Sequence, residues 1–244
     1  MKEQKANRPF LLSGACNVRE LGGYVNMDGQ TTKTHAFLRA DGLFRLTMQD
    51  QKKLYDYGVR CVVDLRSERE TELYPCNLIG YENIEYMGIE LFDHVQSNQL
   101  HGGFPSSLSA MYKELLDQSQ PGMLRVFQTF ARHDADCVVF NCTAGKDRTG
   151  VVAMLLLKLA GVSDAMVTVD YAASANNLRE LFVAQREGLA REGYPTPDYL
   201  FASDAEQMQQ TLDYLQAQYG GSEAYLRAIG LTETQMQRVK AKLI

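Results

Sequence analysis

Val138-Val139-Phe140-Asn141-Cys142-Thr143-Ala144-Gly145-Lys146-Asp147-Arg148-Thr149-Gly150-Val151-Val152-Ala153-Met154 is the stretch that decides the fold expected of this chain. Residues 136–140 form a short run rich in apolar and β-branched side chains, typical of a buried strand. Residues 141–150 are polar, and residues 151–160 are almost wholly apolar and end at Gly161, as a buried helix with a terminal glycine does. A strand, a tight loop and a helix in this order aim backbone N–H groups and a helix dipole at one point, which predicts an anion site.

The loop carries a cysteine, Cys142, and an arginine, Arg148. A nucleophilic cysteine reacts as its thiolate, and a helix N-terminus and nearby cations favour that form. The planar guanidinium of Arg148 can hold two oxygens of a phosphoryl group. Thr149 follows, and its hydroxyl can hydrogen-bond the sulfur when the sulfur leaves. The residues therefore predict phosphoryl transfer to Cys142 and hydrolysis of the thiophosphate. The expected phosphate-binding residues are Thr143, Ala144, Gly145, Lys146, Asp147 and Arg148.

The string from Cys142 to Gly150 resembles the cysteine-dependent protein phosphatases, and within them the bacterial tyrosine/serine phosphatases with dual or triple specificity. Asn17-Val18-Arg19-Glu20-Leu21-Gly22-Gly23-Tyr24 is similar to the N-terminal motif of that branch, and residues 37–40, 63–66 and 219–243 also fit. The resemblance spans nearly the whole chain. It implies protein-tyrosine phosphatase activity, with phosphoserine, phosphothreonine and phosphoinositides as further substrates.

The fold expected is α/β, with a central, mainly parallel sheet of about four or five strands and helices on both faces. The C-terminal part should be all helical. A length of 244 residues suits one domain over residues 1–244. Residues 164–219 are expected to form a helical wall or lid over the active site.

The composition of the chain limits which partners and which cellular compartment are expected. The chain has no apolar run long enough for a transmembrane helix, and its polar start has no signal-peptide pattern. Five cysteines in no metal-like spacing favour a reduced, cytoplasmic setting, although export by a non-classical route stays open. A net charge of −5 gives no indication of a nucleic-acid partner. The four histidines are scattered, so neither a metal nor another cofactor is expected; the oligomeric state is left open.

The departing oxygen needs a general acid, and the attacking water needs a base. The resemblance implies that Asp147, inside the loop, serves in catalysis. Asp93, in the long polar loop after an expected strand at 83–91, is the second candidate, either as the acid or as a residue that positions Arg148.

Arg66 ends another expected strand, at the edge of the sheet where ligands bind in such folds. It is expected either to contact the substrate or to form a salt bridge with Glu68 or Glu70.

Two loop residues bear on substrate and rate. Lys146 completes a Cys-x-x-Gly-Lys-x-Arg pattern similar to that of phosphoinositide phosphatases, which indicates an inositol phospholipid beside a phosphorylated protein as substrate. Asn141 stands where the family usually has a histidine. An asparagine can hydrogen-bond the loop backbone but brings no cation. The alternative function is therefore a pseudophosphatase that binds phosphorylated ligands with weak or no turnover.

A second alternative is a thiolate enzyme of sulfur transfer or arsenate reduction. Such an enzyme would not need the Gly145-Lys146-Asp147 segment, and arsenate reduction would require a second cysteine nearby. Cys137 is five residues upstream of Cys142 on the expected strand, so it is not expected to reach the site.

Overall fold

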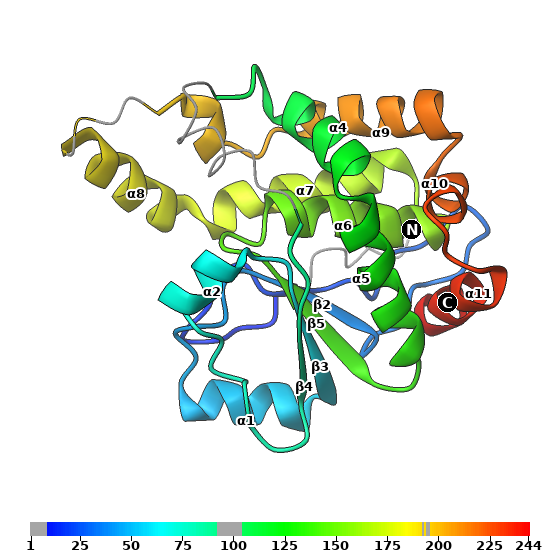
Figure 1. Cartoon of the computed structure of the whole chain (residues 1–244), viewed down its shortest axis with the longest axis horizontal. Coiled ribbons are helices and arrows are strands. Elements are labelled where there is room, and N and C mark those ends of the chain that lie inside the picture. Colours follow the sequence, from blue (N-terminus) through cyan, green and yellow to red (C-terminus); the bar gives the residue numbers. More distant parts are fainter. Residues whose placement is uncertain (1–8, 92–103, 192, 194–195) are drawn as a thin grey trace.

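The computed structural model describes residues 9–91, 104–191, 193 and 196–244. In this part of the chain five strands form one sheet in the order β1-β2-β5-β3-β4 (Figure 1). Strands β2, β5, β3 and β4 are parallel, and the short β1 is antiparallel to β2. The bounds are β1 Arg19–Glu20, β2 Phe37–Ala40, β3 Val59–Asp64, β4 Glu85–Gly88 and β5 Cys137–Asn141. The expected α/β fold with a mainly parallel sheet flanked by helices is confirmed.

Strand β5 lies at the centre of the sheet, and all of its residues are buried. Its unbroken apolar run suits this position, because a central strand of a parallel sheet is covered on both faces. Its last residue, Asn141, is in register with Ala40 at the end of β2 and with Asp64 at the end of β3. The carboxyl ends of three strands therefore meet at one edge, where ligands bind in open α/β sheets. The segment that follows β5 starts at that point.

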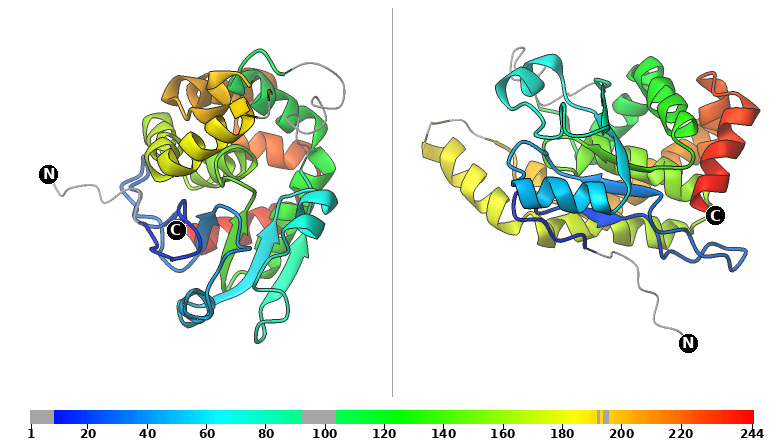
Figure 2. Two further views of the ribbon diagram at one scale, coloured as in Figure 1. Left: turned by 90° about the vertical axis from the view of Figure 1, so that its left-hand side faces the viewer. Right: turned by 90° about the horizontal axis from the view of Figure 1, so that it is seen from below.

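Helices cover both faces of the sheet (Figures 1 and 2). One face packs against α1, whose Leu54 joins the smaller core with Val62 and Val139. The larger core lies on the other face and includes most of α6, in which 11 of 13 residues are buried. A helix that is apolar on all sides belongs in the interior. The helices are α1 Met48–Asp56, α2 Glu68–Leu73, α4 Leu108–Gln118, α5 Gln120–Arg132, α6 Asp147–Leu159, α7 Asp164–Asn177, α8 Arg179–Arg191, η1 Asp198–Phe201, α9 Ala205–Tyr219, α10 Ser222–Ala228 and α11 Glu233–Leu243.

Beyond β5, the described elements are all helical, as expected. Helix α8 differs from its neighbours because Phe182 is its only buried residue, and it extends away from the body of the molecule (Figure 1). None of the helices in the described ranges has both the length and the apolar content needed to cross a bilayer.

Candidate active site

The loop between β5 and α6 has the tight shape that an anion site requires. Gly145 adopts a φ of +64°, and a Cβ atom there would lie 2.4 Å from the carbonyl oxygen of Ala40. Only glycine fits this position without moving the backbone of β2. The chain then enters α6 at Asp147, so the first turn of a buried helix adjoins the loop.

Three groups hold the loop carbonyls from outside. The Asn17 amide donates to the carbonyls of residues 144 and 145 at 3.0 and 3.1 Å. Arg39 donates to the carbonyl of residue 145 at 2.8 Å, and the Gly42 N–H donates to that of Thr143 at 3.0 Å. Among the described residues, the N–H groups of 143–146 donate to no protein acceptor. With the carbonyls held outside, these N–H groups form a concavity suited to an anion.

A buried ion cluster, made of Arg19, Arg39, Asp170 and Tyr24, fixes Arg39 in place. Asp170 on α7 accepts from Arg19 Nε at 3.1 Å, from the Tyr24 hydroxyl at 2.9 Å and from Arg39 Nη1. Burial opposes the charge of Asp170, but the two guanidinium groups and Tyr24 lower the pKa of its carboxyl. Arg19 of the N-terminal motif thus forms a buried ion pair with Asp170.

Arg148 forms a two-pronged ion pair with Glu70 of α2. Nη1 and Nη2 lie 2.7 and 2.9 Å from the two carboxylate oxygens, and the Thr143 hydroxyl also donates to Glu70. Burial alone would raise the pKa of Glu70, but the hydrogen bond and charge of Arg148, with the Thr143 hydroxyl, lower it to about 2. Glu70 is therefore charged at neutral pH and orients the guanidinium at the loop.

Asp147 is held at one carboxylate oxygen. Oδ1 accepts from the Tyr112 hydroxyl of α4 at 2.6 Å and lies 3.3 Å from Lys146 Nζ. The Tyr112 hydroxyl also lies 2.6 Å from that of Tyr171 on α7. The Asp147 side chain is 29% exposed, and Oδ2 accepts no hydrogen bond from the described residues. This arrangement leaves Oδ2 available to exchange a proton with a bound ligand.

Lys146 is buried, and its ammonium points toward the helical C-terminal part. Nζ donates to the carbonyls of Leu200 and Ala202, both at 2.8 Å, and lies 5.4 Å from the ring centre of Phe182. The charge of Lys146 is not solvated at the surface, because the side chain is 1% exposed. Its contacts tie the loop to residues 198–202.

Asn141, which precedes Cys142, and Thr149, which follows Arg148, are both completely buried. Neither side chain has a polar partner among the described residues. The two amide atoms of Asn141 and Oγ1 of Thr149 have no hydrogen-bond partner among the described residues. The expected hydrogen bond from Asn141 to the loop backbone is therefore wrong for this structure. The expected bond from Thr149 to the sulfur is likewise not formed here. Such orphaned groups destabilise a fold and are concentrated at functional sites.

Arg66 lies at the predicted strand end but pairs within its own segment. Its Nη2 is 2.7 Å from Asp64, Nη1 donates to the carbonyl of Tyr74, and the side chain is 1% exposed. The salt bridge expected with Glu68 or Glu70 is thus made with Asp64 instead. This geometry gives no support to a substrate contact. The other alternative residue, Asp93, falls outside the described residues.

The remaining cysteines differ from Cys142 in position or environment. Burial raises the pKa of Cys61 to about 12 and that of Cys76 to about 11. Cys137 belongs to the core on the α1 side of the sheet, whereas Cys142 belongs to the core on the other side. The described residues contain no cluster of His, Cys, Asp and Glu that could hold a metal.

Sequence reasoning did not assign roles to several groups that shape the loop. Asn17 and Arg39 lie in matched motifs, and an arginine in the apolar run of β2 was a signal of a buried ion pair. Glu70 was considered only as a partner of Arg66. Tyr112 carried no signal, because nothing in the pattern of α4 separates it from an ordinary core residue.

The chain is similar to known proteins over most of its length. A model described as the tyrosine phosphatase family matches residues 10–244. A tyrosine-protein phosphatase of Nostoc commune is 36% identical over 229 residues, which cover 85% of this chain and 74% of that protein. A protein of Cupriavidus necator with the provisional name of tyrosine-protein phosphatase is 25% identical over 222 residues, covering 86% of this chain and 80% of that protein.

Proposed function

Because the chain belongs to the tyrosine phosphatase family, we propose that it hydrolyses phosphotyrosine monoesters through a cysteinyl-phosphate intermediate on Cys142. The observation that carries this proposal is the loop itself. Its carbonyls are held by Asn17, Arg39 and Gly42, its N–H groups lack protein acceptors among the described residues, and Glu70 orients Arg148. These groups together form a cradle for a dianionic phosphoryl group beside a cysteine.

In the first step, the thiolate of Cys142 attacks phosphorus, and the bond from phosphorus to the substrate oxygen breaks. The N–H groups of residues 143–148 and the Arg148 guanidinium stabilise the charge on the transferring oxygens. Asp147 gives a proton from Oδ2 to the leaving oxygen. In the second step, water attacks phosphorus, Asp147 takes a proton from the water, and the bond between sulfur and phosphorus breaks. Thr149 donates to the departing sulfur after rotation of its hydroxyl.

The proposal extends to phosphoserine, phosphothreonine and inositol phospholipids as further substrates. The sequence pattern around Lys146 indicates a phosphoinositide substrate. The structure gives this substrate less support, because the Lys146 ammonium donates hydrogen bonds to the carbonyls of Leu200 and Ala202. If Lys146→Ala lowers turnover of phosphotyrosine and phosphoinositide equally, Lys146 does not select lipid.

We also assign residues 1–244 to one catalytic domain, in which residues 164–219 form a wall beside the site. The contacts of Lys146 with residues 198–202 support this arrangement. Helix α7 supplies Asp170 and Tyr171 to the groups behind the loop.

The alternative is a pseudophosphatase, and Asn141 is the observation that favours it. The family histidine would bring a cation to this position, whereas the Asn141 amide is buried without a partner among the described residues. Such a protein would bind phosphorylated ligands in the same cradle without turning them over.

Release of inorganic phosphate from a phosphotyrosine peptide and from an inositol phospholipid tests both functions. We expect the natural chain to turn over the peptide and Cys142→Ser to lose that turnover entirely. The ratio of the two substrates ranks protein against lipid. Absence of turnover, with tight phosphopeptide binding by both forms, would refute the enzyme and support the binding protein.

A further inference from the structure

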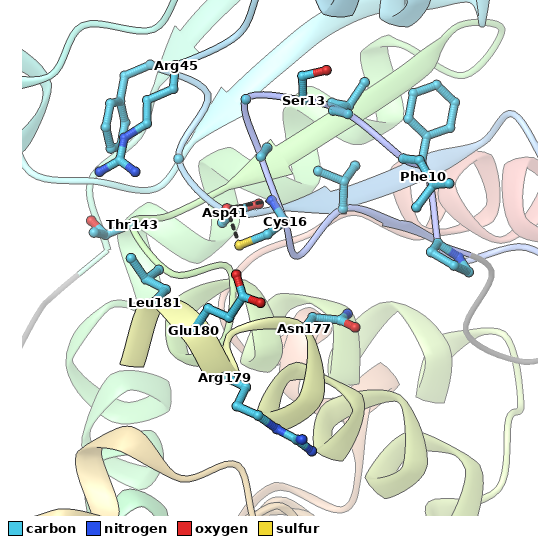
Figure 3. Close-up of a pocket in the computed structure, with 18 of the residues that line it drawn as sticks. Phe10, Ser13, Cys16, Asp41, Arg45, Thr143, Asn177, Arg179, Glu180 and Leu181 are labelled. Atoms are coloured by element: carbon cyan, nitrogen blue, oxygen red, sulfur yellow. Dashed lines mark hydrogen bonds between the residues drawn. The ribbon is translucent and has the colours of Figure 1, made fainter. Parts of the chain in front are cut away.

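A groove of about 970 Å³ opens beside the catalytic loop (Figure 3). Its walls come from three separate parts of the chain, namely residues 9–18, residues 41–45 and residues 176–185. Thr143, which follows the nucleophile directly in sequence, lines it as well. A volume near the upper end of the usual range for ligand sites exceeds what one phosphorylated side chain fills. The groove therefore has space for parts of a substrate that lie beyond its phosphate.

The floor of the groove is held by hydrogen bonds. The N–H groups of Cys16 and Asn17 donate to the buried Asp41 carboxylate at 3.0 and 2.9 Å. The next residue, Gly42, donates to the carbonyl of Thr143. Burial and the Asp41 carboxylate raise the pKa of the Cys16 thiol to about 12. The thiol is therefore protonated and a poor nucleophile at neutral pH, and we assign it only a structural role in the floor. A floor fixed before binding reduces the ordering cost of a ligand.

The lining combines apolar side chains with two exposed arginines on different walls. Phe10, Leu12 and Leu181 supply partly buried apolar surface. Arg45 lies on the wall next to Thr143, and Arg179 opens α8 on the wall across from it (Figure 3). The groove also has further polar lining, including the exposed carboxylate of Glu180 and the amides of Asn176, Asn177 and Gln185.

Each arginine keeps its charge available at the surface. Arg45 makes a cation–π contact with Phe44, its guanidinium carbon 5.1 Å from the ring centre. Arg179 donates to the neutral side-chain oxygen of Asn176 at 2.9 Å. Neither guanidinium takes part in an ion pair among the described residues. Two exposed cations on opposite walls complement a chain that carries acidic side chains.

We propose that this groove binds the polypeptide that flanks the phosphorylated residue, and that Arg45 and Arg179 select acidic side chains in it. This inference rests on the proposed function, because the groove adjoins the phosphate cradle at Thr143. A peptide fits better than a lipid, since the lining combines apolar side chains with the amides of Asn176, Asn177 and Gln185, which can hydrogen-bond a peptide backbone. The cradle takes the phosphate, and the groove recognises its surroundings.

The test compares three substrates: a phosphotyrosyl peptide with Asp and Glu on both sides, the same peptide with Asn and Gln instead, and 4-nitrophenyl phosphate. The variant is the double substitution Arg45→Gln and Arg179→Gln. The matched control is Arg191→Gln, which removes another exposed arginine of α8 that does not line the groove. One exposed ion pair changes affinity by up to about fivefold.

We expect the double variant to raise KM for the acidic peptide by about tenfold, with the neutral peptide and the aryl phosphate changed less than about twofold. The control should leave all three unchanged. An equal loss on all three substrates would overturn the inference, because it would show that the two arginines stabilise the site and do not select acidic side chains. No loss on the acidic peptide would also overturn it.

Turnover and peptide binding distinguish an inactive enzyme from a groove that binds no peptide. If the natural chain hydrolyses none of the three substrates, the enzyme is refuted. The affinity of the groove for the labelled acidic peptide is then measured by fluorescence anisotropy. The measurement uses Cys142→Ser with and without the two arginine substitutions. Weaker binding caused by those substitutions supports the groove, and unchanged binding overturns it.

Discussion

Asp170→Asn should be among the most damaging single changes to both stability and the loop. The substitution keeps the size of the side chain but removes the one negative charge between Arg19 and Arg39. It also turns an acceptor into an amide with N–H donors, so a donor then faces a guanidinium. Burial and the nearby Arg39 already lower the pKa of Arg19 to about 10, against the opposing effect of Asp170. Loss of that charge leaves two buried cations uncompensated.

Removal of one partner from a buried ion pair costs about 3–5 kcal/mol. At about 1.4 kcal/mol per factor of ten, the folding equilibrium constant should fall by roughly two to four factors of ten. For a chain of this size, about 2–4 °C of Tm is lost per kcal/mol, which gives a decrease of about 6–20 °C. Because Arg39 also donates to the carbonyl of Gly145 at 2.8 Å, the folded variant should lose activity as well, by about tenfold.

Urea unfolding followed by circular dichroism measures the first effect, and kcat/KM for an aryl phosphate measures the second. Asp164→Asn is the matched control, because Asp164 lies on the same helix and pairs with Lys158 at the surface. That change should cost about 1 kcal/mol or less. If Asp170→Asn costs no more than its control, the buried ion cluster does not stabilise the fold and the reasoning is refuted.

Three further predictions concern the site. Tyr112→Phe removes the 2.6 Å hydrogen bond to Asp147 and should slow turnover of poor leaving groups about tenfold, while good leaving groups change little; an equal effect on both in a leaving-group series would contradict a role in proton transfer. Asn141→His should raise turnover and the rate of thiol alkylation several-fold, because a cation joins the loop; no gain in either assay would show that the asparagine is no handicap. The pKa of Glu70 is lowered from 4.5 to about 2, so its pairing with Arg148 stabilises the fold above about pH 4.5, and this contribution is lost as the pH falls toward 2. Urea unfolding between pH 6 and pH 3 should show this loss, and Glu70→Gln should make the profile flatter; identical profiles would contradict the assignment.

Much of the fold could be predicted because its signals are local. The apolar run of β5, the polar loop and the apolar run of α6 are contiguous, and each is recognisable from the residues of that segment alone. The capping boxes at Thr47 and at Thr232 with Gln235 are local in the same way, since a cap involves residues within one turn. The resemblance added the family, which the comparisons confirm.

The partners of the loop residues could not be predicted, because they are distant in sequence. Arg148 and Glu70 are separated by 78 positions, and Arg19 and Asp170 by 151. Nothing in a local pattern states which acid meets which arginine. Arg66 shows this limit, since three acidic residues were within reach along the chain and the one that pairs with it, Asp64, was not considered.

The sequence by itself thus determined the strand–loop–helix unit, the candidate nucleophile Cys142 and the phosphate chemistry, because these depend on residue types at fixed spacing. Only the tertiary structure decided that Lys146 turns toward Leu200, that Tyr112 holds Asp147 and that a groove with two arginines adjoins Thr143. The physical reason is that these contacts form when separate elements pack. Packing is set by the whole core, and no single segment encodes it.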